Sequence, residues 1–144
     1  MKKQLTPEEL ERKDKAKQEL KEYRENITYI KEKRDDIEEY IALIEGATSN
    51  LSNTSNNSIT DKIGNSVSRL EALKKDMNEK LEVLLLRKFI IDDKIDKLKY
   101  PYRDILFMRY SRVQAWEEIS DKLHYNEQYI KNLHSTALIL YGSL

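Results

Sequence analysis

Apolar residues recur along two stretches of the sequence with spacings of three and four residues. In the first stretch they are Leu20, Tyr23, Ile27, Ile30, Ile37, Ile41 and Ile44, and in the second Ile63, Val67, Leu70, Met77, Leu81, Leu84, Ile91, Ile95 and Leu98. On a helix this spacing forms a single apolar seam, as in a coiled coil. The pattern therefore predicts two long helices with matched seams, in which charged residues fill the skipped seam positions Arg34, Lys74 and Lys88.

Signals at the ends of these stretches predict where the helices begin and end. Thr6 can cap a helix, Pro7 suits its first position, and Glu9 stands where a capping box has its carboxylate. Residues 46–60 are mostly Ser, Thr and Asn, which compete with helical hydrogen bonds, and Gly46 is placed to end the first helix. We therefore expect a polar loop over 46–60 and an antiparallel helical hairpin over residues 1–98.

Two helices packed only against each other bury a narrow apolar stripe. Such a hairpin either packs against a second copy of the chain or leans on the C-terminal part. Basic residues at seam positions are typical of register control in multi-helix bundles, so we expect a homodimer or higher homo-oligomer through the arm.

The C-terminal part, residues 99–144, differs in its sequence pattern, which predicts shorter helices. Pro101 biases Tyr100 away from helical backbone angles, and a short helix is expected to follow. An amphipathic stretch from Trp116 to Leu123 precedes His-Tyr-Asn, a turn, and Asn126 can cap a helix from Glu127 to about residue 140. Two helices joined by a three-residue turn have the spacing of a helix-turn-helix.

Composition supports an all-α protein and narrows its chemistry. The 144 residues include three glycines and two prolines, so turns are few, and no cysteine, so disulfides and thiolate metal sites are excluded. The charged start lacks the apolar segment of a signal peptide, and no apolar run is long enough to cross a bilayer. We expect a cytoplasmic protein without a membrane-spanning segment.

Nothing in the sequence has the spacing of a catalytic or metal site. The paired acids Asp35-Asp36, Glu38-Glu39 and Asp92-Asp93 occupy adjacent helical positions, which point about 100° apart and cannot converge on one ion. There is no Gly-rich phosphate loop and no nucleophile with a histidine partner at a motif spacing. We expect neither an enzyme nor a bound metal or cofactor.

The segment "RDILFMRYSRVQAWEEISDKLHYNEQYIKNLHSTAL", residues 103–138, resembles region 4 of bacterial sigma factors. Over roughly residues 20–140 the chain is similar to small proteins of phages and prophages of Gram-positive bacteria, in which a coiled arm precedes a region-4-like end. The relatives called ArpU and RinA, which regulate phage late genes, share this general plan. The resemblance implies a transcription regulator that binds double-stranded promoter DNA, alone or together with the RNA polymerase of the bacterial host.

In region 4 the second helix of the pair enters the major groove near its N-terminal end. The resemblance implies a reading helix that begins at Asn126 and aims Glu127, Gln128, Lys131, Asn132 and Ser135 outward. Helical periodicity agrees, because Ile130, Leu133, Ala137 and Leu138 form an apolar stripe on the opposite side, which we expect to be buried. Gln and Asn side chains can pair with adenine, and Arg112 and Lys122 can hold the DNA backbone. For His134 we expect a packed, hydrogen-bonded side chain rather than a base contact, and for Trp116 a place in the core rather than a stacking platform.

The charge balance of the chain supports an alternative to this DNA-binding interpretation. The chain has 26 basic and 26 acidic residues, and from Lys99 onward six basic residues stand against five acidic ones. So few cations predict weak DNA binding, because affinity for phosphates rises with the number of counterions released. The alternative is a protein-protein adaptor that binds RNA polymerase, a phage protein or a host factor without reading DNA.

Overall fold

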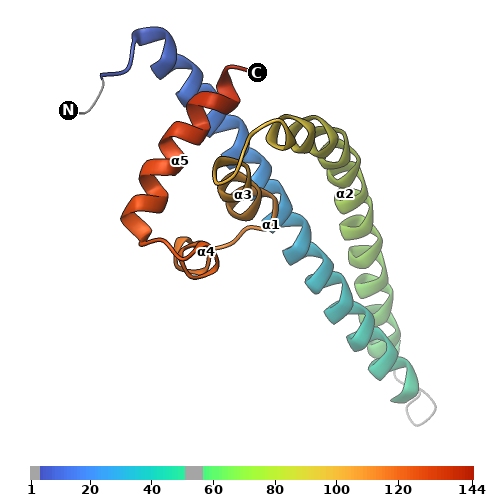
Figure 1. Ribbon diagram of the computed structural model, residues 1–144. Helices are drawn as coiled ribbons and strands as arrows, with labels where there is room; N and C mark the ends of the chain where they lie inside the picture. The colour runs from blue at the N-terminus through green and yellow to red at the C-terminus, as the bar shows by residue number, and fades with distance from the viewer. Residues whose placement is uncertain (1–3, 51–56) are drawn as a thin grey trace. The chain divides into compact units, whose positions relative to one another are not determined.

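The computed structural model describes residues 4–50 and 57–144, and every regular element in these two ranges is helical (Figure 1). In chain order the elements are α1 (Pro7–Asn50), α2 (Asn57–Asp96), α3 (Tyr102–Leu106), the π-helical turn η2 (Phe107–Ser111), α4 (Trp116–Leu123) and α5 (Glu127–Gly142). The predicted all-α class is confirmed. No helix in the described ranges is long and apolar enough to span a membrane.

The first helix begins as the sequence predicts and ends later. The Glu9 backbone N–H donates to Thr6 Oγ1 at 3.2 Å, so Thr6 caps α1 and Pro7 is its first residue. The prediction that Gly46 ends this helix is wrong, because α1 continues to Asn50. A single glycine costs a helix only about 1 kcal/mol, which the propagating hydrogen bonds of a long helix can offset.

The predicted polar loop over 46–60 is also wrong at both ends. Residues 46–50 belong to α1 and residues 57–60 belong to α2. Their low helix propensity is a weak preference that neighbouring helical turns override. The rest of the predicted loop, residues 51–56, lies outside the described part of the chain.

The described residues divide into two compact units, one formed by residues 4–27 and 84–144 and the other by residues 28–50 and 57–83. The first unit thus joins the beginning of α1 and the end of α2 to the four C-terminal elements. The second contains the remaining parts of α1 and α2. The domains expected from the sequence, 1–98 and 99–144, stay a prediction, since compactness is not a test of independent folding.

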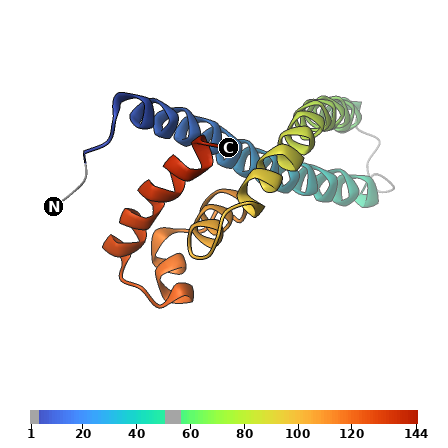
Figure 2. The ribbon, with the colours of Figure 1, turned by 45° about the horizontal axis from the view of Figure 1, so that its top comes forward.

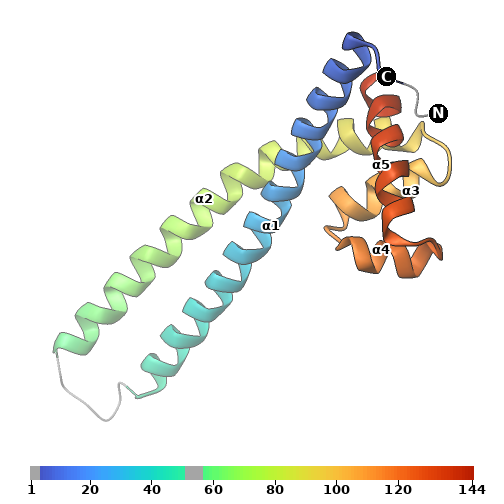
Figure 3. The same cartoon turned by 90° about the vertical axis from the view of Figure 1, so that its left-hand side faces the viewer.

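In the second unit, α1 and α2 lie side by side along their length (Figures 1 and 3). Ile37 and Leu70 are buried, whereas most other seam residues of this unit are half-buried. Tyr29 on α1 donates its hydroxyl to Asp76 Oδ2 on α2 at 2.5 Å, and Lys80 Nζ lies 3.8 Å from the centre of the Tyr29 ring. These contacts fix α1 and α2 to each other where apolar burial is incomplete.

In the first unit, the start of α1 packs closely on the end of α5 (Figures 1 and 2). The Tyr141 hydroxyl donates to Glu19 Oε1 at 3.2 Å, and Lys94 Nζ of α2 lies 4.5 Å from the Tyr141 ring centre. A Cβ atom added to Gly142 would come within 2.6 Å of the Arg12 carbonyl oxygen. Glycine is therefore needed at residue 142 for this approach of two helix backbones.

The end of α2 carries apolar residues on two opposite faces. The seam residues Leu84, Ile91 and Ile95 are buried within the first unit. The opposite face exposes four large side chains that belong to no predicted seam, and we call them the α2 patch: Leu85 (44% exposed), Leu86 (69%), Phe89 (70%) and Ile90 (60%).

Candidate nucleic-acid interface

The turn between α4 and α5 has the length that the sequence predicts. His124 ends α4 with φ 60° and ψ 35°, in the left-handed region that histidine tolerates better than most residues. Its backbone N–H donates to the Ser120 carbonyl at 3.0 Å, and Ser120 Oγ donates to the Tyr125 carbonyl at 2.5 Å. These bonds hold the chain as it reverses from α4 toward α5.

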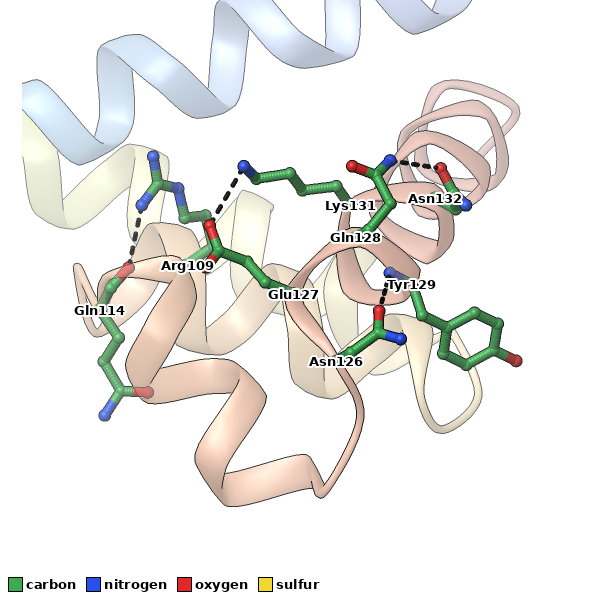
Figure 4. A network of polar contacts seen from close by, with 8 residues as sticks. All are labelled: Arg109, Gln114, Asn126, Glu127, Gln128, Tyr129, Lys131 and Asn132. Carbon is green, nitrogen blue, oxygen red and sulfur yellow. Dashed lines mark hydrogen bonds and ion pairs between the residues drawn. The ribbon is translucent and has the colours of Figure 1, made fainter.

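Asn126 caps the second helix of the pair. Its Oδ1 accepts the Tyr129 backbone N–H at 2.8 Å, as Figure 4 shows, and α5 runs from Glu127 to Gly142. The cap confirms the predicted helix start, and the helix ends two residues beyond the predicted end near Leu140. It also commits the amide oxygen of Asn126 to the backbone, so that only its NH₂ group is available to a ligand.

Apolar side chains fix α4 and α5 against each other and against α3. Ile105, Ile119 and Ile130 are fully buried, and Leu123 is nearly so. Met108, Trp116 and Leu133 are partly buried and pack against this cluster. The expected inward stripe of α5 is present, although Leu133 lies at its edge.

The predicted reading residues lie along the exposed side of α5 and pair with one another. Lys131 Nζ lies 3.1 Å from Glu127 Oε1, and Gln128 Nε2 donates to Asn132 Oδ1 at 3.3 Å (Figure 4). Gln128, Lys131 and Asn132 are exposed, whereas Glu127 and Ser135 are half-buried. A ligand would have to replace two weak, solvent-exposed contacts to engage these side chains.

The two expected backbone-binding cations lie elsewhere in the same unit. Arg112 and Lys122 line a cleft of about 410 Å³ together with Arg103, Asp96 and Asp104. Lys131 does not line this cleft, so the predicted site residues fall into two groups.

His134 is buried, as expected, at the inner edge of α5. Its Nε2 lies 2.6 Å from the Tyr110 hydroxyl, and its ring meets the Trp116 ring edge-on with centres 4.8 Å apart. Burial, followed by the positive charges of Arg109, Lys17 and Lys13, lowers the pKa of His134 to about 4. The imidazole is therefore neutral at pH 7, and its pKa depends on the positive charges around it.

Two of these cations, Arg109 and Lys17, line a second cleft of about 450 Å³ between α1, η2 and α5, which we call the cationic cleft. Five basic side chains and one carboxylate line it: Lys17, Lys21, Arg24, Arg109 and Lys131, with Glu25. Tyr110, Trp116, His134 and Ser135 complete its wall. Of the predicted DNA contacts, Lys131 and Ser135 line this cleft. The helices α1 and α5 diverge toward the N-terminal end of α5 (Figures 1 and 2).

Hydrogen bonds and a stacking contact hold the floor of the cationic cleft. Arg24 Nε donates to the Arg109 carbonyl at 3.2 Å, and Arg109 Nη1 donates to the Gln114 carbonyl at 3.1 Å. The Arg109 guanidinium also lies 4.3 Å from the Trp116 ring centre. Burial and the nearby charge of Arg24 lower the pKa of Arg109. Two arginines in such proximity form a site that favours an anion.

Sequence reasoning missed the basic residues of α1. Lys13, Lys17, Lys21 and Arg24 are spaced by four, four and three residues, which places them on one helix face. This signal is visible in the sequence, but acidic residues interleave with it, so the local charge is balanced. This basic face can be recognised as part of a candidate binding site only in the folded structure, where α1 packs beside α5.

Within residues 4–50 and 57–144 no group of acidic, histidine or cysteine side chains is arranged to hold a metal ion. The side chains of α5 and of the cationic cleft offer hydrogen bonds and positive charge. Comparison with known proteins finds no match for this chain among protein-family models, curated proteins or solved structures.

Proposed function

We propose that the protein is a transcription regulator of phage or prophage type that binds promoter DNA through a helix-turn-helix formed by α4 and α5. The observation that carries this proposal is the turn at His124 and Asn126, which joins two helices through a shared core. It leaves the amides of Gln128 and Asn132 exposed on the second helix. Such amides can pair with adenine in the major groove, and Lys131 can reach guanine or phosphate.

DNA selection with the full chain tests this function. Random DNA duplexes are selected for binding to the purified protein. The sequences of the selected duplexes are then compared with DNA from the gene's own neighbourhood. In a triple variant, Gln128→Ala with Lys131→Ala and Asn132→Ala, we expect sequence preference to relax and affinity to fall by about 1 to 3 kcal/mol for each base that is no longer bound. The matched control replaces Asn65, Lys75 and Asn78, exposed residues of the second unit, and should bind as the unchanged protein does.

The same experiment separates the regulator from the adaptor. If the triple variant and its control bind equally, α5 does not read DNA. If the triple variant then fails to bind RNA polymerase while the control succeeds, the adaptor function replaces the one proposed.

The half-buried carboxylate of Glu127 is the feature of the reading helix that disfavours phosphate contact.

We also propose that the protein is a homodimer, formed through the α2 patch rather than through the heptad seams. Leu84, Ile91 and Ile95 are buried within one chain, so the seam of α2 is already occupied there. Leu85, Leu86, Phe89 and Ile90 present on the order of 400 Å² of apolar surface, so a two-fold contact would bury roughly 800 Å². A stable interface needs about 1,000 Å² or more, so the expected dimer is weak and its population rises with protein concentration. A formal net charge of +0 leaves no general repulsion between copies.

Light scattering on the full chain tests the dimer. Leu86→Ser with Phe89→Ser should convert a dimeric mass into a monomeric one, because these changes place hydroxyl groups in an apolar interface. Leu43→Ser, at a residue of the second unit that is 61% exposed, is the control and should leave the dimer intact. A monomeric mass for the unchanged chain at all concentrations would refute the proposal. Binding of the patch to lipid vesicles instead would identify a different occupant.

A further inference from the structure

We propose that the cationic cleft binds a phosphate of the DNA backbone, so that the N-terminal part of α1 belongs to the DNA-binding surface. This inference rests on the proposed function and extends it to residues far from the helix-turn-helix in sequence. It assigns phosphate contacts to Lys17, Lys21 and Arg24 of α1 and to Lys131 of α5.

The position of the cleft supports this assignment. Lys131 lines the cleft and lies on the exposed side of α5 with the amides of Gln128 and Asn132. A major groove that receives a helix has a phosphate backbone on each side of it. A backbone beside the Lys131 edge of α5 would therefore meet the side chains of α1.

The charges of the cleft favour a phosphate over a neutral ligand. Five cations face one carboxylate, Glu25, which lies 4.0 Å from Lys21 Nζ. Lys131 is paired with Glu127 at the rim, whereas Lys17 has no ion-pair partner in the described ranges of the chain. Arg109 is fixed by its bond to the Gln114 carbonyl, so a charged group is in place before any ligand arrives. A preorganised cation loses little side-chain entropy on binding an anion.

The cleft also resolves the shortage of cations expected from the sequence. Residues 99–144 alone offer about one net positive charge. Lys17, Lys21 and Arg24 add three more cations beside the reading helix. Since DNA affinity follows the number of phosphates neutralised, α1 would supply much of the binding that the C-terminal part lacks.

The test measures how DNA affinity depends on salt. The double variant Lys17→Gln with Lys21→Gln removes two exposed lysines of the cleft, and Lys31→Gln with Lys75→Gln removes two exposed lysines of the second unit as a control. We expect the slope of log affinity against log salt to fall by about 0.9 for each phosphate that is no longer neutralised, equally for all DNA sequences. Sequence preference should be retained, because α5 is unchanged.

The outcomes separate this inference from the proposed function. If the protein binds DNA and both double variants have the slope of the unchanged chain, the cleft does not hold phosphate, whereas the reading function stands. The reading function is tested beside it with Gln128→Ala and Asn132→Ala, which leave Lys131 in the cleft. If that variant keeps the affinity and sequence preference of the unchanged chain but the cleft variant loses affinity and slope, α1 binds DNA and the reading function fails.

The pKa of His134 gives a second readout that does not use affinity. A phosphate in the cleft would offset the charges of Lys17 and Arg109, so DNA should raise the pKa of His134 from about 4, followed by NMR of the imidazole. His124→Asn leaves His134 as the sole histidine and assigns the signal, since asparagine also tolerates the left-handed backbone at residue 124. No rise on saturation with DNA would overturn the inference. An equal rise with a polyglutamate peptide would reassign the cleft to carboxylates.

Discussion

Two parts of α2 carry the same three-and-four spacing of apolar residues but differ in burial. In the first unit, Ile91 and Ile95 are 1% and 0% exposed. In the second, Ile63, Met77 and Leu81 are half-buried and Val67 is 38% exposed. The difference follows from the number of neighbours, because the end of α2 is packed among several helices, whereas the rest of α2 has α1 beside it.

Polar contacts follow the same division. At the end of α2, Asp92 accepts from Ser111 of η2 at 3.1 Å, and Lys94 contacts Glu19 of α1 and the Tyr141 ring of α5. In the second unit the contacts between helices centre on Tyr29, Asp76 and Lys80. An apolar seam thus fixes which face of a helix is covered, and the helices around it decide how completely.

The largest expected effect compares one isoleucine from each unit. Ile95→Ala removes a fully buried side chain and should lower the free energy of unfolding by about 2 to 5 kcal/mol. Ile63→Ala removes a half-buried side chain of the same seam and should cost less, about 1 kcal/mol. Chemical denaturation measures both. Equal losses would show that the two units are packed alike.

The next effect is a pH dependence that belongs to the first unit. The pKa of His134 is about 4 in the folded protein and near 6.5 when unfolded, so only the unfolded chain takes up a proton as pH falls between these values. Stability should therefore fall by about 3 kcal/mol from pH 6.5 to 4, an order-of-magnitude figure. His134→Gln should remove this dependence, even though Arg109, Lys17, Lys13 and Tyr110 remain around the position. The same slope in the variant would assign the effect to other groups.

A smaller effect is expected at Gly142, where α5 meets α1. Gly142→Ala places a Cβ atom against the Arg12 backbone and should cost about 1 to 3 kcal/mol, because one helix must shift. Hydrogen exchange should rise in residues 12–24 and stay unchanged in residues 63–83. Gly64→Ala is the control, since its added Cβ has no neighbour within 4 Å, and it should stabilise α2. Loss of protection throughout α1 and α2 would contradict the separation of the units.

The smallest effect compares two asparagines. Asn126→Ala removes the cap of α5 and should cost about 1 kcal/mol. Asn65→Ala replaces an exposed residue within α2 and should change stability by less than about 0.5 kcal/mol, in the stabilising direction, because alanine favours helix. Thermal unfolding of the two variants shows whether the contribution of asparagine depends on its position at the start of a helix. If both destabilise alike, the cap contributes nothing.

Sequence reasoning located the helices better than it located their neighbours. The caps at Thr6 and Asn126, the turn at His124 and the helix Trp116–Leu123 are local features, set by one residue and its next few neighbours along the chain. The same local rule failed at Gly46, because it ignored the cooperativity of a 44-residue helix. Of the predicted site residues, Gln128, Lys131 and Asn132 lie together on α5, while Arg112 and Lys122 line a different cleft.

The sequence by itself determined that this protein is helical, where most of its helices begin, and which face of each helix is apolar. Periodicity and capping are properties of a few consecutive residues, so they can be read without a fold. Only the tertiary structure decided that Lys17, Lys21 and Arg24 lie beside α5, and that Leu86 and Phe89 stay exposed while Ile91 and Ile95 are buried. Those outcomes depend on which helices pack together, and residues more than 100 positions apart in sequence make that choice through contacts such as Glu19 with Tyr141.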